Sequence, residues 1–139
     1  MAIDYGTKRI GLAVTDPQRI IATALDTVLS HQIIQYLDNY FKKETVETII
    51  LGYPKTLADT ISSTTKLVEK FATVLKKKFP HIPIEFVDER FTSLLAKRSL
   101  IESGQNKKTR RDKSVLDKVS AVIMLQSYLD QQPLRNTVL

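Results

Sequence analysis

The chain contains no cysteine. This absence excludes disulfides, thiolate metal sites and cysteine nucleophiles, and it fits a protein of the reducing cytoplasm. No apolar run approaches the length of a membrane span, and the N-terminus has no basic segment followed by an apolar core, so we expect no membrane partner. Aromatic residues make up only 7% of the chain, which gives no obvious platform for stacking bases.

Length and composition are those of a globular protein. The 139 residues suffice for one ordinary domain and are too few for two. Hydrophobic residues account for 42% of the chain and charged residues for 26%, a balance typical of folded domains. We find no repeat and no low-complexity linker, and we therefore expect residues 1–139 to form one domain with a frayed tail over about 133–139.

Positive charge is concentrated in one segment. The formal net charge is +6, and residues 107–113 hold five positive groups and one negative group, a net of +4 that leaves +2 for the rest of the chain. Such a segment is typical of a loop that faces phosphate, and equally of a solvated surface loop. Both interpretations remain open on composition alone.

The hydrophobic pattern predicts a mixed α/β fold. Strands are expected over residues 2–5, 10–15, 20–28, 46–51 and 84–87, and helices after Ser30, over 61–79, over 92–103 and after the basic segment. Ser30 has the side chain of a helix cap. An antiparallel meander followed by right-handed crossovers gives a mixed sheet covered by helices. In the last helix, the apolar period predicts this inner stripe: Val115, Val119, Val122, Gln126 and Leu129.

Acidic residues occupy three structurally awkward places. Asp4 lies inside an apolar strand, where a carboxylate is costly unless it is hydrogen-bonded, paired or bound to a metal. Asp88 and Glu89 follow the last strand, and Asp117 opens the final helix. Ala121, one turn beyond Asp117, is small enough to let that helix pack close to the sheet.

These carboxylates point to a site at the carboxyl ends of the strands, where open α/β sheets bind ligands. If the first and last parallel strands are neighbours, Asp4 and Glu89 approach each other and need a proton or a divalent cation between them. Because His31 and His81 are far away in sequence, the donors are all oxygen, which favours Mg²⁺ or Mn²⁺ over zinc. Two such ions about 3.5–4 Å apart are a usual apparatus for cutting phosphodiesters.

Each carboxylate also has a structural interpretation. Asp4 can accept hydrogen bonds from the turn that begins at Gly6. Glu89 can pair with a neighbouring cation such as Arg90. Asp117 can be the first-turn acid of a capped helix, where the helix dipole favours negative charge.

Four segments together resemble the YqgF (RuvX-like) family of bacterial proteins. They are "IDYGTKRIGLAVTD", "LGYPKTLADT", "FVDERFTS" and "KSVLDKVSAVIMLQSYLD", in the family's order and spacing, and the resemblance runs from residue 2 to about 130. Members are described as Holliday junction resolvases and as nucleases of pre-16S ribosomal RNA. The resemblance implies a ribonuclease H-like fold: a five-stranded mixed sheet, with a three-strand antiparallel meander and two parallel strands, flanked by helices on both faces.

The resemblance also implies a site. Asp4, Glu89 and Asp117 would be the catalytic triad and the ligands of Mg²⁺ (or Mn²⁺). The residues expected to bind nucleic acid are Lys8, Arg9, Arg90, Lys107, Lys108, Arg110, Arg111 and Lys113.

The implied function is a metal-dependent endonuclease that hydrolyses phosphodiesters in structured nucleic acid, above all in processing precursor 16S ribosomal RNA. The alternatives are a Holliday junction resolvase and a non-catalytic nucleic-acid-binding module of ribosome assembly. The Asp-x-Gly-Thr stretch also resembles the first phosphate loop of actin-like and sugar-kinase ATPases, but those enzymes clamp ATP between two such domains. Expected partners are precursor ribosomal RNA or branched DNA and the assembling ribosome, with the protein a monomer or weak homodimer.

The chain departs from the family pattern in two places. Two or three more residues usually precede the Ile-Asp-Tyr-Gly stretch, so the first strand is expected to start abruptly at Met1. Residues 54–60 read Pro-Lys-Thr-Leu-Ala-Asp-Thr, whereas the family reads closer to Pro-Leu-Asn-x-Asp-Gly. The contacts of this loop are therefore open.

Overall fold

The structure is a computed structural model that describes residues 1–53, 63–88 and 113–131. Several expected elements lie outside the described residues. Among them are the helix over 92–103, the atypical loop over 54–60 and the frayed tail over 133–139.

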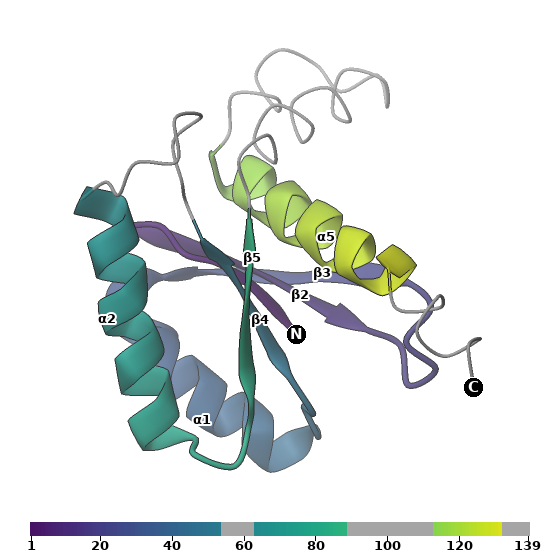
Figure 1. Cartoon of the computed structure of the whole chain (residues 1–139), viewed down its shortest axis with the longest axis horizontal. Coiled ribbons are helices and arrows are strands. Elements are labelled where there is room, and N and C mark those ends of the chain that lie inside the picture. Colours follow the sequence, from purple (N-terminus) through teal and green to yellow (C-terminus); the bar gives the residue numbers. More distant parts are fainter. Residues whose placement is uncertain (54–62, 89–112, 132–139) are drawn as a thin grey trace.

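A mixed five-stranded sheet forms the centre of the fold (Figure 1). Its order is β3-β2-β1-β4-β5, so the short first strand is the middle one. The β1–β2 and β2–β3 pairs are antiparallel, and the β1–β4 and β4–β5 pairs are parallel, which confirms the predicted meander and crossovers. The strands are β1 (Ala2–Asp4), β2 (Arg9–Thr15), β3 (Ala22–Leu29), β4 (Ile49–Tyr53) and β5 (Ile84–Asp88).

Helices cover both faces of the sheet (Figure 1). On one face, strand residues such as Ile3 and Leu51 pack against Leu37 and Leu75, which lie in α1 (Ile33–Lys43) and α2 (Ser63–Lys78). The other face packs against α5 (Lys113–Gln131). In the described part of the chain, no helix is both long and apolar enough to cross a membrane.

The α5 face is built from small residues. Ala2, Ala13 and Ala22 of the sheet and Ala121 of α5 are all buried in one cluster. Short side chains on both sides let the helix axis come close to the sheet, as predicted for Ala121. Gln126 fixes the helix along the strands, because its Oε1 accepts a 3.0 Å hydrogen bond from the Ala22 amide.

The predicted inner stripe of the last helix is wrong in part. Leu129 is buried as expected, but Val119, Val122 and Gln126 are only half-buried. The side chain of Val115 is outside the description. The apolar period pointed to the valines, but the helix is rotated so that the small residues Ser120 and Ala121 face the alanines of the sheet. Within residues 118–130 of the helix, the buried positions are Ser120, Ala121, Met124, Leu125 and Leu129.

Ser30 does not cap α1, contrary to the prediction. Its hydroxyl donates a 2.6 Å hydrogen bond to the Thr7 carbonyl, and its amide donates to the Lys8 carbonyl at 2.9 Å. A 3₁₀ turn, η1 (Ser30–Gln32), then intervenes before α1. Ser30 thus ties the end of β3 to the turn that follows β1, rather than closing a helix.

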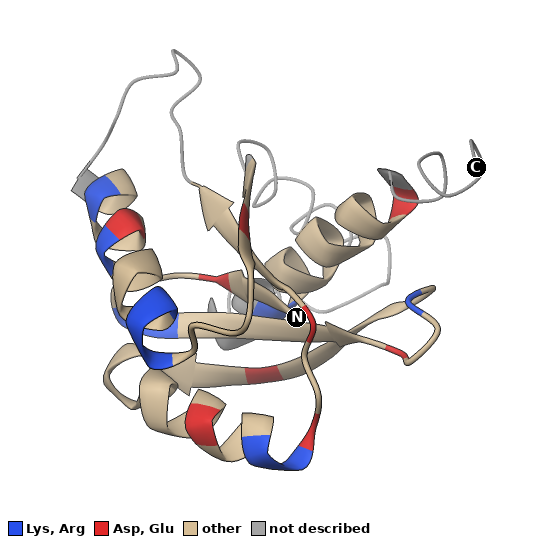
Figure 2. Cartoon of the chain, turned by 60° about the horizontal axis from the view of Figure 1, so that its bottom comes forward, with Lys and Arg blue, Asp and Glu red and all other residues tan. Residues whose placement is uncertain are grey.

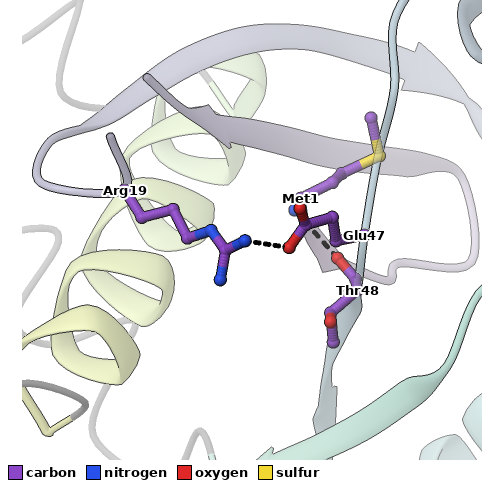
Figure 3. Close-up of polar contacts among 4 residues, drawn as sticks. All are labelled: Met1, Arg19, Glu47 and Thr48. Carbon is purple, nitrogen blue, oxygen red and sulfur yellow. Dashed lines mark hydrogen bonds and ion pairs between the residues drawn. The ribbon is translucent and has the colours of Figure 1, made fainter. Parts of the chain in front are cut away.

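The start of the chain is anchored to β4 (Figure 3). The Met1 α-amino group donates a 3.0 Å hydrogen bond to the Thr48 carbonyl, and the Met1 carbonyl accepts one from the Ile50 amide at 2.8 Å. Burial lowers the pKa of this amino group to about 6. The group is therefore largely uncharged at neutral pH, which makes its burial tolerable.

The β2–β3 connection is organised by Asp16. Its Oδ1 accepts hydrogen bonds from the amides of Ile20 and Ile21 at 2.7 and 2.8 Å, and Arg19 adopts a φ of 59° within the turn. Arg19 also forms an ion pair with Glu47 (Figure 3). The backbone hydrogen bonds, that from Ile21 first, lower the pKa of the Asp16 carboxyl group below its usual 3.8.

A lowered pKa makes the contribution of Asp16 depend on pH. The unfolded state takes up the proton first, so the stabilisation is complete above about pH 4 and is lost as the pH falls through the folded-state pKa. We expect Asp16→Ala to lower the free energy of unfolding at pH 7 and the difference from wild type to shrink at pH 3. Urea unfolding at both pH values measures this. The same difference in unfolding free energy between wild type and Asp16→Ala at pH 7 and pH 3 would contradict a role for the ionised Asp16 carboxylate.

Candidate functional site

Asp4 stands at the end of the central strand, on the face that α5 covers. Ala2 packs against α5, and strand alternation places Asp4 on the same face. Its partner in β2 is Gly11, and Ile3 pairs with Leu51 in β4, so Gly52 follows at the level of Asp4. Both positions beside the half-buried Asp4 carboxylate, one on each neighbouring strand, are therefore glycines without a side chain.

The turn after Asp4 is tight because it contains a glycine. A Cβ on Gly6 would collide with the carbonyl oxygen of Arg9, so no larger residue fits without a shift. This turn brings Lys8, which is exposed, and Arg9, which is half-buried, next to the end of β1. Two of the predicted phosphate-binding residues are thus adjacent to the predicted catalytic aspartate in the fold as well as in sequence.

The first and last parallel strands are not neighbours, so the condition under which Asp4 and Glu89 would lie on adjacent strands is not met. The β4 strand lies between β1 and β5 because each crossover adds its strand on the same side of the sheet. Gly52 of β4 pairs with Val87 of β5, one residue before β5 ends at Asp88. The next residues, Glu89 and Arg90, lie outside the described residues. The carboxyl ends of β1, β4 and β5 nevertheless share one edge, since all three strands are parallel (Figure 1).

Position 117 lies in α5, whose first residue is Lys113. Asp117 therefore belongs to the second turn and does not open the helix, and the first turn contains no acidic residue, which overturns its interpretation as a first-turn cap. Gln126 bonds to Ala22 at the far end of the β2–β3 pair, so the earlier turns of α5 lie toward Asp4 (Figure 1). The backbone at 117 comes one turn before the buried Ala121.

The donor chemistry fits a hard divalent cation. Asp4 supplies carboxylate oxygen, and both histidines, His31 and His81, are exposed on other elements. Among the described residues, no three acidic, histidine or cysteine side chains form a group able to hold a metal. Carboxylate donors would select Mg²⁺ or Mn²⁺ over zinc. The predicted basic residues at 107, 108, 110 and 111 lie outside the described residues.

Sequence reasoning missed one aromatic feature near this edge. Tyr53, the last residue of β4, packs edge-on against Phe86 of β5 with ring centroids 5.4 Å apart. The Tyr53 hydroxyl donates a 2.6 Å hydrogen bond to Glu69 of α2. The low aromatic content concealed the pair, although aromatic residues in two neighbouring parallel strands were a usable signal.

Comparisons with known proteins agree along nearly the whole chain. The model of the RuvX family, described as Holliday junction resolvase, matches residues 1–131. A protein of Bacteroides fragilis named "Putative pre-16S rRNA nuclease" is 48% identical over 134 residues, which is 96% of this chain and 97% of its own. A relative of the same name in Porphyromonas gingivalis is 50% identical over 130 residues, 94% of each chain.

A solved structure is similar in fold. The fowlpox virus resolvase, determined in complex with its substrate Holliday junction DNA, covers 94% of this chain and 95% of its own with a TM-score of 0.56. At 11% sequence identity this similarity shows the fold alone, which is the predicted ribonuclease H-like arrangement.

Proposed function

Because the chain belongs to the RuvX family, we propose that it is a metal-dependent endonuclease that cuts phosphodiester bonds in precursor 16S ribosomal RNA. The observation that carries the proposal is the place of Asp4, at the end of the central strand and between two glycine positions, beneath the helix that contains Asp117. The names of the relatives supply the substrate. Precursor ribosomal RNA is made in the bacterial cytoplasm, so the proposal implies a cytoplasmic enzyme.

In the proposed mechanism, Asp4, Glu89 and Asp117 would hold Mg²⁺ or Mn²⁺. A divalent cation in such a centre lowers the pKa of water and stabilises charge on the phosphate that is attacked. Lys8 and Arg9 hold the RNA backbone beside the end of β1, together with Arg90 and the basic segment 107–113. Phosphate contacts position the substrate without reading its sequence, so binding is salt-sensitive and weakly sequence-selective.

A Holliday junction resolvase is the second candidate function. The description of the family and the fold shared with the fowlpox virus enzyme favour it. A resolvase must cut two strands, which calls for a homodimer, whereas an RNA-processing enzyme can act as a monomer. A ribosome-assembly module that binds RNA without cutting it is the third candidate.

Cleavage of matched substrates separates the three candidates. We expect the purified protein with Mg²⁺ to cut a labelled precursor 16S RNA fragment faster than a four-way DNA junction under single-turnover conditions. Faster cutting of the junction would favour the resolvase. Binding of RNA without cutting of either substrate would favour the assembly module.

A further inference from the structure

The outer face of α2 carries a stripe of lysines. Val68, Phe71 and Leu75 are buried against the sheet, which turns the opposite side of the helix to solvent. Lys66, Lys70 and Lys77 are exposed on that opposite side, at spacings of four and seven residues that bring side chains to one face. From the helical rise, the stripe extends roughly 16 Å.

The charge of this stripe is largely uncompensated. The helix contains five lysines and one acidic residue, Glu69, and Figure 2 shows basic segments recurring along α2. The carboxylate of Glu69 accepts the hydrogen bond from Tyr53. The ion pairs Arg19–Glu47 and Lys42–Asp38 lie on other elements than α2.

An exposed aromatic ring lies on the face of the sheet that α2 covers. Phe86 of the edge strand β5 is 44% exposed, although it packs edge-on against Tyr53. The hydrogen bond from Tyr53 to Glu69 links that aromatic pair to α2. Exposed lysines and an exposed aromatic ring are the groups by which proteins bind single-stranded nucleic acid, through phosphates and through a stacked base.

We propose that α2 and Phe86 form a second RNA-binding surface, which holds a single-stranded extension of the substrate. Lys66 and Lys70 bind consecutive phosphates, and the ring of Phe86 stacks on an unpaired base. Tyr53 ends β4 at the edge of the sheet where Asp4 lies, so this surface begins near the proposed site and leads away from it along α2. The inference rests on the proposed function, and it specifies that the enzyme prefers RNA with a single-stranded extension.

Two variants test the surface. Lys66→Gln/Lys70→Gln removes two charges from the stripe, and Lys42→Gln/Lys43→Gln removes two exposed charges from the end of α1 as a matched control. Binding is measured in EDTA by fluorescence anisotropy, between 50 and 200 mM KCl. The ligands are an RNA duplex with a single-stranded tail and the same duplex with blunt ends.

We expect the α2 double variant to bind the tailed RNA about tenfold more weakly at low salt. Its slope of log affinity against log salt should fall by about 1.4, since each phosphate contact on a single strand contributes about 0.7. Phe86→Leu should weaken binding of the tailed RNA about tenfold and leave the blunt duplex unaffected, because it removes stacking and keeps an apolar side chain. The control pair should bind like wild type.

Wild-type binding of the tailed RNA by either the α2 double variant or Phe86→Leu would overturn the inference. If wild type still cuts the precursor RNA in that case, the proposed function stands and this surface alone is refuted. If wild type neither binds nor cuts RNA, the proposed function fails and the second surface fails with it. With Asp4 intact, both variants should cut saturating RNA at the wild-type rate, since neither change touches the reacting phosphate.

Discussion

Replacing Asp4 with asparagine is expected to reduce the single-turnover rate of RNA cleavage by on the order of 100-fold or more, because even changes in residues that only support metal ligands cost about 10–100-fold. Asparagine has nearly the same shape and keeps one oxygen acceptor, but it lacks the charge that would hold a divalent cation. Since Asp4 is half-buried at the end of β1, the fold should tolerate this change. Circular dichroism and RNA-binding assays should therefore match those of wild type.

Asp38→Asn is the matched control for this experiment. Asp38 lies in α1, which packs on the opposite face of the sheet from α5, and it pairs with Lys42 at 3.4 Å on the surface. An exposed pair of this kind contributes little, so the control should cut RNA at the wild-type rate. Undiminished cleavage by Asp4→Asn would instead assign Asp4 to the turn that begins at Gly6, as the structural interpretation holds.

Ala121→Leu is expected to lower the free energy of unfolding by about 1–3 kcal/mol, the usual cost of overpacking a close contact. Ala121 lies on the side of α5 that faces the sheet and is fully buried against its alanines. A leucine there must push the helix away from the sheet. That movement would also displace Asp117, one turn earlier, and cleavage should fall along with stability. Urea unfolding and single-turnover rates measure the two effects.

Ser127→Leu controls for adding the same side chain to the same helix. Ser127 is exposed, so its substitution should leave both stability and cleavage near wild type. If the Ala121→Leu variant is as stable and as active as this control, the close packing of α5 on the sheet is not what places Asp117 for cleavage.

The sequence predicted the elements of the fold better than their spatial order. Strand pairing through the Gly6 turn follows from local chemistry, and the structure confirms it. The place of β4 between β1 and β5 is set by how each crossover packs, and no residue pattern in the separate strands encodes it. Asp4 ends β1, and Glu89 follows β5 in the sequence, so the two strands concerned are not neighbours, although the shared carboxyl edge was predicted correctly.

Side-chain roles were harder to predict where one residue type serves two purposes. Ser30 has the chemistry of a helix cap, but its hydroxyl bonds across to Thr7, because the end of β3 lies against that turn. Ala121 was recognised as a close-packing residue from its size, whereas the buried Ser120 beside it was not, since serine usually faces water. The exposed stripe on α2 could be predicted from lysine spacing, but its link to Phe86 depends on the tertiary contact through Tyr53.

The most direct test of the central claim is the cleavage of a precursor 16S RNA fragment by wild-type protein, with the products followed over time in Mg²⁺ and in EDTA. A carboxylate metal centre at the end of β1 predicts defined products in Mg²⁺ and none in EDTA. Equal cleavage in EDTA would contradict a metal-dependent site built around Asp4, and RNA that stays intact in both conditions while bound would contradict the nuclease itself.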